Sequence, residues 1–385
     1  MKKVGAMLLV VAMTVSMILG CASKGDTKEA SEGSGETSGD SVEIEFQQWF
    51  DNEMEEGYLQ SVCDSFYEET GIKVKLLSNP YADTKTQLQA SAVAGTMADV
   101  VALDGSWIYD YATQGMLMDM NDLFGQIGFD TGDISVQTSV NGTVYAQPLV
   151  NFPCLMAVNR GILKDAGVTK MPETWTEFLD VCKKVTKPDE NVYGFAMNMS
   201  TDNATCREYF AAFAGNSGCS ILTEEGKPFL AGNDTFVRTA EFFKSLFDNK
   251  VVTPGMYTMT DADKVEEFVN GRVAFMADSV AHLTNIREQA PDMDVTYINM
   301  PHEDSYSGES FMRSNNWACG IAKNSEHPKE AAQFIAYLLG KDVNADLSVH
   351  AGGFAVNTTS EPVYEDDSDA FKAICDIYKT TTGKA

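Results

Sequence analysis

Apolar side chains in the first half of the chain recur with the periods of strands and helices in turn. Residues 42–46 and 72–76 are predicted to be strands, and the continuous apolar run 100–103 is typical of a buried parallel strand. Residues 58–69 and 84–94 are predicted to be helices, each followed by a glycine suited to a left-handed cap. This order of strand, helix, strand, helix, strand predicts βαβ units on a parallel sheet.

The second half of the chain repeats this pattern. Thr174 to Glu177 have the form of a capping box, and Trp175, Phe178 and Cys182 follow on one helical face. Residues 263–269 are predicted to form a helix that turns at Asn270-Gly271 into a strand over 272–277, and another helix runs from Pro328 to Leu339. A further amphipathic helix is predicted from Phe236, Val237, Ala240, Phe243 and Phe247.

The chain begins with a segment that has the form of a signal peptide. Lys2 and Lys3 precede an uncharged run, residues 4–19, that is too short to anchor the chain across a bilayer. The run ends in Leu19-Gly20-Cys21, which resembles the bacterial lipobox. We therefore expect residues 1–20 to be removed and Cys21 to carry lipid; the alternative is an ordinary signal peptide followed by a chance cysteine.

The next segment is predicted to be a flexible linker, which with Cys21 covers residues 21–41. Residues 22–41 hold no apolar side chain larger than alanine, so they cannot bury a core. As a random coil such a linker reaches about 25 Å. The folded body is therefore expected to start near Val42.

Charge and cysteine content narrow the class of protein. The chain has 28 basic and 56 acidic residues, a formal charge of −28, which argues against nucleic acid as a partner and against electrostatic docking on anionic lipid. Seven cysteines besides Cys21 include no CxxC pair, and the sequence leaves open a disulfide between Cys206 and Cys219. The four histidines are scattered, so no metal site and no cofactor is predicted.

No catalytic motif is present in the sequence. It contains no GxSxG, no P-loop, no HExxH and no GxGxxG after a predicted strand. Carboxylates are so abundant that no pair stands out as a glycosidase pair. The sequence therefore predicts a binding protein rather than an enzyme.

Aromatic and polar side chains gather where predicted strands end. Ligands of open α/β sheets bind at the carboxyl ends of strands, and aromatic walls with a few polar groups suit a sugar. The candidate ligand-binding residues are Trp49, Asp51, Asp104, Trp107, Asn151, Phe152, Asp278, Arg313, Asn315 and Trp317. For the three tryptophans, packing in the core is an equally weighted alternative; Tyr81 is weakly indicated, and His282 is expected to lie on a helix surface.

Several motifs along the chain, among them Met171-Pro-Glu-Thr-Trp-Thr-Glu-Phe178, occur in an order that resembles the motif order of the extracellular solute-binding proteins of ABC importers, in the carbohydrate-binding group. The segment Met171-Pro-Glu-Thr-Trp-Thr-Glu-Phe178 is the most specific of them. The others include Glu68-Glu-Thr-Gly-Ile-Lys-Val74, Ala94-Gly-Thr-Met-Ala-Asp-Val100, Gly142-Thr-Val-Tyr-Ala-Gln-Pro148 and Phe268-Val-Asn-Gly-Arg-Val-Ala-Phe-Met276. The chain departs from the pattern at Asp278 to His282, where relatives often carry an aromatic residue. It also ends where relatives commonly continue, so the segment from Glu361 is expected to be either incomplete or trimmed.

The resemblance implies an α/β fold of two lobes, each a mostly parallel sheet flanked by helices, joined by hinge strands. Lobe one would comprise residues 42–151 plus 317–352, and lobe two residues 152–316 plus 353–385. The implied protein is a monomer on the outer face of the cell membrane, of a Gram-positive-type bacterium, that captures a mono- or oligosaccharide for the permease subunits of an importer. Alternatives are a binding protein for a polyamine, peptide or sulfonate, a surface glycoside hydrolase, and a sensory partner of a membrane receptor.

Overall fold

The computed structural model of the protein describes residues 42–135, 138–200, 205–221, 223, 227–366, 368–381 and 383–384. The signal peptide, the lipid on Cys21 and the linker lie outside these residues. The described strands join into one sheet with the central order β2-β1-β3-β9-β5-β7-β6. Its strands are β1 (Glu43–Gln48), β2 (Lys73–Ser78), β3 (Val100–Asp104), β4 (Thr138–Val140), β5 (Thr143–Asn159), β6 (Tyr193–Ala196), β7 (Val273–Ser279), β8 (Val295–Ile298), β9 (Phe311–Ile321), β10 (Phe354–Ala355) and β11 (Gly383–Lys384).

The two ends of the sheet are parallel and its centre is antiparallel. β1 pairs in parallel with both β2 and β3, and β6 pairs in parallel with β7, which confirms the βαβ units predicted for the first half. β9 is antiparallel to β3, and β5 is antiparallel to β9 and to β7. The sheet is therefore mixed, with parallel strands on either side of two antiparallel strands.

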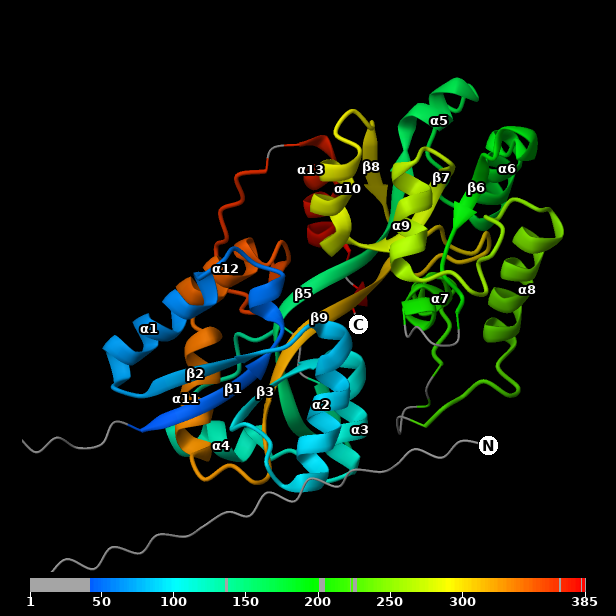
Figure 1. The fold of residues 1–385 in the computed structure, drawn as a ribbon. Helices are drawn as coiled ribbons and strands as arrows, with labels where there is room; N and C mark the ends of the chain where they lie inside the picture. The colour runs from blue at the N-terminus through cyan, green and yellow to red at the C-terminus, as the bar shows by residue number, and fades with distance from the viewer. Residues whose placement is uncertain are drawn as a thin grey trace, which may run out of the picture. The chain divides into compact units, whose positions relative to one another are not determined.

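The long strands β5 and β9 connect two lobes (Figure 1). The first half of β5 pairs with β4 and its second half with β7 and β8, while β9 lies beside β5 from Ala146 to Cys154. Asn151 and Trp317, where the crossings between lobes are expected, lie within these paired strands. Any change of angle between the lobes must therefore bend this antiparallel pair.

Helices cover each lobe (Figure 1). Those of the first lobe are α1 (Tyr58–Thr70), α2 (Tyr81–Ala94), α3 (Ile108–Thr113), α4 (Met120–Ile127), α11 (Pro328–Leu338) and α12 (Lys341–His350). Those of the second lobe are α5 (Arg160–Asp165), α6 (Trp175–Val185), α7 (Thr205–Gly215), α8 (Asp234–Asp248), α9 (Asp261–Val269), α10 (Leu283–Gln289) and α13 (Asp369–Thr380). Short 3-10 helices are η1 (Phe50–Asn52), η2 (Gly105–Trp107), η3 (Pro188–Glu190) and η4 (Val280–His282).

Most of the predicted helices form where local signals place them. α1 buries the stripe that begins with Leu59 and Val62, and it ends at Gly71 with φ at 75°, as predicted. Thr174 caps α6 by accepting a hydrogen bond from the Glu177 amide, but the Glu177 carboxylate accepts from the amide of Glu173, at 2.8 Å. Thr174 thus supplies the predicted cap, while the returning contact of Glu177 reaches one residue further back than a capping box requires.

The predicted apolar stripe of α8 is wrong in phase. Val237 is 47% exposed, whereas Phe242 and Leu246 are buried, together with Phe243 and the polar Thr239. The hydroxyl of Thr239 lies 3.3 Å from that of Ser217, so a hydrogen bond makes its burial tolerable. Spacing of phenylalanines alone could not identify a face that includes a threonine.

The described residues form two apolar clusters, one within the second lobe and one that extends through both lobes. The cluster of the second lobe contains Phe178, Phe195 and Phe213. The other cluster surrounds Phe46 and Phe334 in the first lobe and continues along the crossing strands. Cysteines 63, 154, 182, 206, 219, 319 and 375 are all free, so the structure forms no disulfide between Cys206 and Cys219. None of the described helices combines the length and the apolar character needed to cross a membrane.

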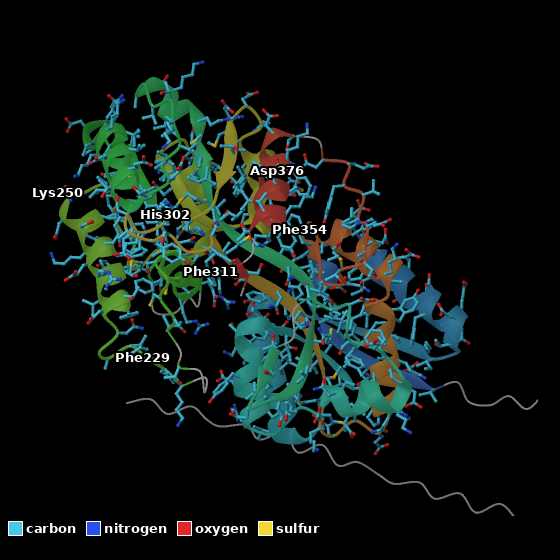
Figure 2. The ribbon with its side chains drawn as sticks, turned by 180° about the vertical axis from the view of Figure 1, so that it is seen from behind. Phe229, Lys250, His302, Phe311, Phe354 and Asp376 are labelled. Atoms are coloured by element: carbon cyan, nitrogen blue, oxygen red, sulfur yellow. The ribbon has the colours of Figure 1, made fainter. Side chains whose placement is uncertain are left out.

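The C-terminal helix α13 touches both the second lobe and the crossing strands. It packs against β8, and the ring of Tyr378 stacks on that of Phe354 with centroids 4.1 Å apart. Phe354 belongs to β10, which pairs with β5 at Val150 and Asn151. Figure 2 labels Phe354, together with Asp376 of α13. α13 therefore supports the pair of strands on which the lobes would move.

Candidate functional site

A cleft of about 190 Å³ opens where strands from both lobes end. Its walls come from the segments after β1 and β3, from the crossing strands, and from the segments around α7, α9 and η4. The lining residues are Trp49, Glu53, Tyr81, Asp104, Phe152, Tyr209, Asp261, Ser279, Ala281, His282, Asn315, Asn316 and Trp317. Carboxyl ends of strands in α/β sheets commonly form ligand sites, so this position is the expected one.

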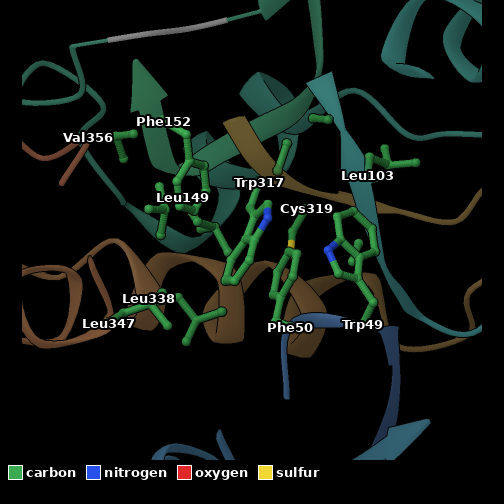
Figure 3. Close-up of a cluster of buried hydrophobic side chains, with 14 of the residues drawn as sticks. Trp49, Phe50, Leu103, Leu149, Phe152, Trp317, Cys319, Leu338, Leu347 and Val356 are labelled. Atoms are coloured by element: carbon green, nitrogen blue, oxygen red, sulfur yellow. The ribbon is translucent and has the colours of Figure 1, made fainter. Parts of the chain in front are cut away.

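An aromatic cluster forms one side of this cleft (Figure 3). Trp49 is 1% exposed, with its ring centroid 5.5 Å from that of Trp107 and 6.4 Å from that of Trp317. Trp317 stacks on Phe50 at 4.4 Å and lies 5.1 Å from Phe152. Trp49 and Trp317 thus belong to the core and at the same time border the cleft, so the two alternatives left open by the sequence are not exclusive for them, whereas Trp107 is buried outside the lining.

Tyr81 adds an exposed aromatic ring to the buried cluster. It is 45% exposed, and its ring stacks on Trp107 with centroids 5.4 Å apart. Its hydroxyl donates to the carboxylate of Asp104 at 3.2 Å, and Asp104 also accepts from the Ser106 amide at 2.8 Å. An aromatic face with a hydrogen-bonded carboxylate at its edge can pack on the C–H face of a sugar and accept from its hydroxyls.

A buried ion cluster lies on the second-lobe side of the cleft. The ammonium of Lys264 is fully buried and lies 3.0 Å from the carboxylates of both Asp261 and Asp278. It also donates to the Tyr209 hydroxyl and to the Ala277 carbonyl, each at 2.8 Å. These contacts hold α9 and the end of β7 together, and thereby fix the side chains of Tyr209 and Asp261 in the cleft wall.

His282 extends this cluster toward the cleft. Its Nδ1 lies 2.7 Å from Oδ1 of Asp278, and the charge of Asp278 raises the pKa of His282 above its ordinary value although burial opposes the rise. Burial alone would raise the pKa of Asp278, but the charges of His282 and Lys264 outweigh it and hold that pKa below its usual range. The pair is therefore favoured as imidazolium and carboxylate.

Glu53 lies in the cleft lining on the first-lobe side. Loss of water against the cleft walls raises the pKa of Glu53 to about 7; the charge of His282 opposes this rise and that of Asp104 adds to it. Glu53 thus has two charged neighbours in the cleft, one from each lobe. It carries only part of a negative charge near neutral pH.

Five of the ten predicted site residues line the cleft, namely Trp49, Asp104, Phe152, Asn315 and Trp317. Trp107 lies behind Tyr81, and Asp278 lies beneath His282. Arg313 is held by Glu208, whose carboxylate is 2.6 Å from Nε. The remaining two lie outside the lining: the amide of Asn151 donates to the hydroxyl of Tyr378 at 3.4 Å, and Asp51 accepts from Ser78 at 2.8 Å.

Other lining residues escaped sequence reasoning. Glu53 and Asp261 are two of many acids, and nothing in the sequence sets them apart. His282 lies in the cleft wall rather than on an open helix surface, because η4 turns the chain directly after β7. Asp261 and Lys264 are three residues apart in the sequence, which is the spacing of an ion pair on a helix, but the helix predicted over 263–269 begins after Asp261, whereas α9 includes it. No group of three His, Cys, Asp or Glu side chains that could hold a metal occurs within the described ranges.

Proteins of known sequence share the order of these segments. The maltooligosaccharide ABC transporter solute-binding lipoprotein of Streptococcus pneumoniae (strain ATCC BAA-255 / R6) is 21% identical, over 98% of this chain and 86% of that protein. The arabinooligosaccharide-binding protein of Bacillus subtilis (strain 168) is 22% identical, over 89% of this chain and 77% of that protein.

Solved structures show the same two-lobed fold. The sugar-binding protein MalE from Xanthomonas citri superposes with a TM-score of 0.71 at 19% identity, covering 89% of this chain and 87% of that one. The sequence profile described as "Bacterial extracellular solute-binding protein" matches residues 61–373, which is most of the chain. Because this profile matches most of the chain, the protein is a member of the bacterial extracellular solute-binding protein family.

Proposed function

We propose that this protein captures a saccharide in the cleft between its lobes and presents it to the permease subunits of an ABC importer. The observation that carries the proposal is the cleft wall itself: an exposed Tyr81 ring backed by buried tryptophans, with Asp104 and Asn315 as polar groups around it. Oligosaccharide-binding relatives from Streptococcus and Bacillus support the choice of ligand class.

Binding would act through the angle between the lobes. Because the lining comes from both lobes, a ligand that contacts Tyr81 on one side and His282 on the other favours the closed arrangement over the open one. The crossing strands β5 and β9 would bend during this change. The protein would act as a monomer that binds its solute and releases it unchanged, without catalysis.

Lipid on Cys21 would hold the protein at the outer face of the membrane, as in a Gram-positive-type bacterium. The Streptococcus relative is named a lipoprotein, which supports this proposal. Replacing Cys21 with alanine should release the protein into the medium. A variant that remains in the membrane fraction would exclude lipid on Cys21 as the anchor.

The ligand class is tested by thermal unfolding against a panel of mono- and oligosaccharides. A ligand at 100 times its Kd stabilises the folded protein by about 2.7 kcal/mol, which gives a rise in Tm that grows with concentration. Polyamines, peptides and sulfonates serve as the comparison panel. A rise with one of these and with no saccharide would contradict the sugar assignment while leaving solute binding intact.

A further inference from the structure

The cleft holds more carboxylates than it can neutralise. His282 is the basic side chain of its lining, and Lys264 is buried behind the wall; both are engaged by Asp278, with Asp261 also paired to Lys264. Glu53 and Asp104 are left over, and neither forms an ion pair with any basic side chain in the described part of the chain. Four carboxyl groups beside two bases leave an excess of acidic groups even when His282 is protonated.

The nearest arginine does not correct this imbalance. Nε of Arg313 lies 2.6 Å from the carboxylate of Glu208, which is itself 5% exposed, so the guanidinium is held by a buried partner. Arg313 is also absent from the cleft lining. An anionic solute such as a uronate or sugar phosphate would therefore meet no free positive charge, and repulsion from Glu53 and Asp104 would oppose its binding.

Hydrogen-bonding capacity in the cleft points in the same direction. Asn316 lines the cleft, and its side-chain oxygen is buried without a hydrogen-bond partner. Together with the carboxylates of Glu53 and Asp104, the site presents an excess of acceptors. Such an excess of acceptors favours a ligand that brings donors, and an ammonium group brings three donors together with the missing positive charge.

We propose that the cleft selects saccharides bearing a free amino group, and that Glu53, assisted by Asp104, determines this specificity by pairing with the ammonium. The inference rests on the proposed saccharide binding and adds the chemical class of the sugar. The aromatic side of the cleft holds the ring of the sugar, while Glu53 contacts the substituent. The raised pKa of Glu53 fits this role, because a bound cation supplies the positive charge that would keep its carboxylate ionised.

The test uses matched trios of sugars with isothermal titration calorimetry and thermal unfolding. Each trio holds a neutral sugar, its amino sugar and its uronic acid, built on glucose, galactose and mannose and on β-1,4-linked disaccharides of the first two. In at least one trio we expect the amino sugar to bind about tenfold or more tighter than the neutral sugar, as a charge-assisted hydrogen bond provides, with no measurable binding of the uronate. Added salt should weaken the binding of the amino sugar and leave the affinity for the neutral sugar unchanged.

Variants separate Glu53 from the rest of the site. Glu53→Gln should weaken the binding of the amino sugar more than that of the neutral sugar, so that the preference for the amino sugar is lost. Asp104→Asn, which keeps the oxygen that accepts from Ser106, should reduce this preference. Glu56→Gln is the matched control, because Glu56 is an exposed acid of the same segment outside the cleft lining.

Equal binding of neutral and amino sugars, tight binding of a uronate, or an unchanged preference in Glu53→Gln would overturn this inference with saccharide capture still standing. Absence of binding by every sugar tested would overturn both.

Discussion

Replacing Lys264 with methionine removes the positive charge at the centre of the buried ion cluster and keeps the length of the side chain. The ammonium makes four contacts, two at 2.8 Å with neutral oxygens of Tyr209 and Ala277 and two at 3.0 Å with the carboxylates of Asp261 and Asp278. Asp278 is fully buried, whereas the side chain of Asp261 is 23% exposed. The four contacts therefore differ in what their loss costs.

The burial of Asp278 sets the size of the expected effect. Leaving a buried carboxylate without its partner costs about 3–5 kcal/mol. Loss of the pair with Asp261 adds at most about 1 kcal/mol, because water can reach that carboxylate. His282 still contacts Asp278 at 2.7 Å and offsets part of the loss. We expect the free energy of unfolding of Lys264→Met to fall by about 3–5 kcal/mol near neutral pH.

The loss should depend on pH in a definite direction. In the wild-type protein the pKa of Asp278 is depressed, so its stabilising contribution is present above the unfolded pKa of about 3.9 and is lost as pH falls through the lower folded pKa. Without Lys264 the burial of Asp278 is opposed by His282 alone, so its folded pKa rises. The difference between wild type and variant is therefore largest near neutral pH and shrinks as the pH falls toward 4 and the carboxyl group becomes neutral in the variant.

Urea unfolding followed by circular dichroism at several pH values measures this difference. The double variant Lys264→Met with Asp278→Asn should recover part of the stability, because it removes the unpaired charge. Lys323→Met, at a surface lysine outside the cluster, is the matched control and should change the free energy of unfolding by less than about 0.5 kcal/mol. A loss below about 1 kcal/mol for Lys264→Met, or a double variant less stable than the single one, would refute the role assigned to this cluster.

Three further predictions concern packing and thiols. Gly194→Ala should lower the free energy of unfolding by about 1–3 kcal/mol, because its new Cβ would lie 2.5 Å from Cβ of Cys182. Gly125→Ala in α4 has open space around the new Cβ and should be neutral or stabilising. Urea unfolding of both variants tests this prediction. Trp317→Ala should lower the free energy of unfolding by about 3–5 kcal/mol in the same assay, because the indole ring is buried in the core. A loss below about 1 kcal/mol would exclude a core role for that ring. In a Cys21→Ser variant, a thiol reagent should label three of the seven described cysteines in the native protein and all seven in denaturant. The three reactive cysteines are Cys206, Cys219 and Cys375. The four buried cysteines are Cys63, Cys154, Cys182 and Cys319. Burial raises the pKa of Cys63 and Cys154 to about 12, and rapid labelling of the buried thiols in the native protein would contradict this assignment.

Local signals sufficed for most of the individual strands and helices. The end of α1 at Gly71 and the strand before the cleft at β3 follow from cap chemistry and apolar runs that lie within a few residues. The crossing strand β5 could not be predicted in this way. It contains Pro148 and Pro153, which normally argue against a central strand; the structure accommodates Pro148 at a shift of register against β9.

The cleft was predictable only in outline. Residues after β1 and β3 could be named because strand ends carry ligand sites, and the structure has Trp49 and Asp104 in the cleft wall. The chemistry of Arg313 depends instead on Glu208, about 100 residues away in the chain and brought to it by the packing of α7 on β9. Spacing along a sequence carries no information about such pairs. Arg313 could therefore be named as a candidate ligand-binding residue, although in the folded protein it is paired with Glu208.

The crossing of β5 and β9 also bears on the order in which the chain can fold. β9 begins about 150 residues after β5 ends, and β3 of the first lobe has β9 as its neighbour. At a synthesis rate of about 5–20 residues per second, about 8–30 s pass between the completion of β5 and the appearance of its partner. During this interval neither lobe can close its sheet, since the strand that both of them share does not yet exist. A chain with this topology completes its sheet only after β9 has been made, and a fold that is completed late suits a protein that must pass through a narrow secretion channel to reach the cell exterior.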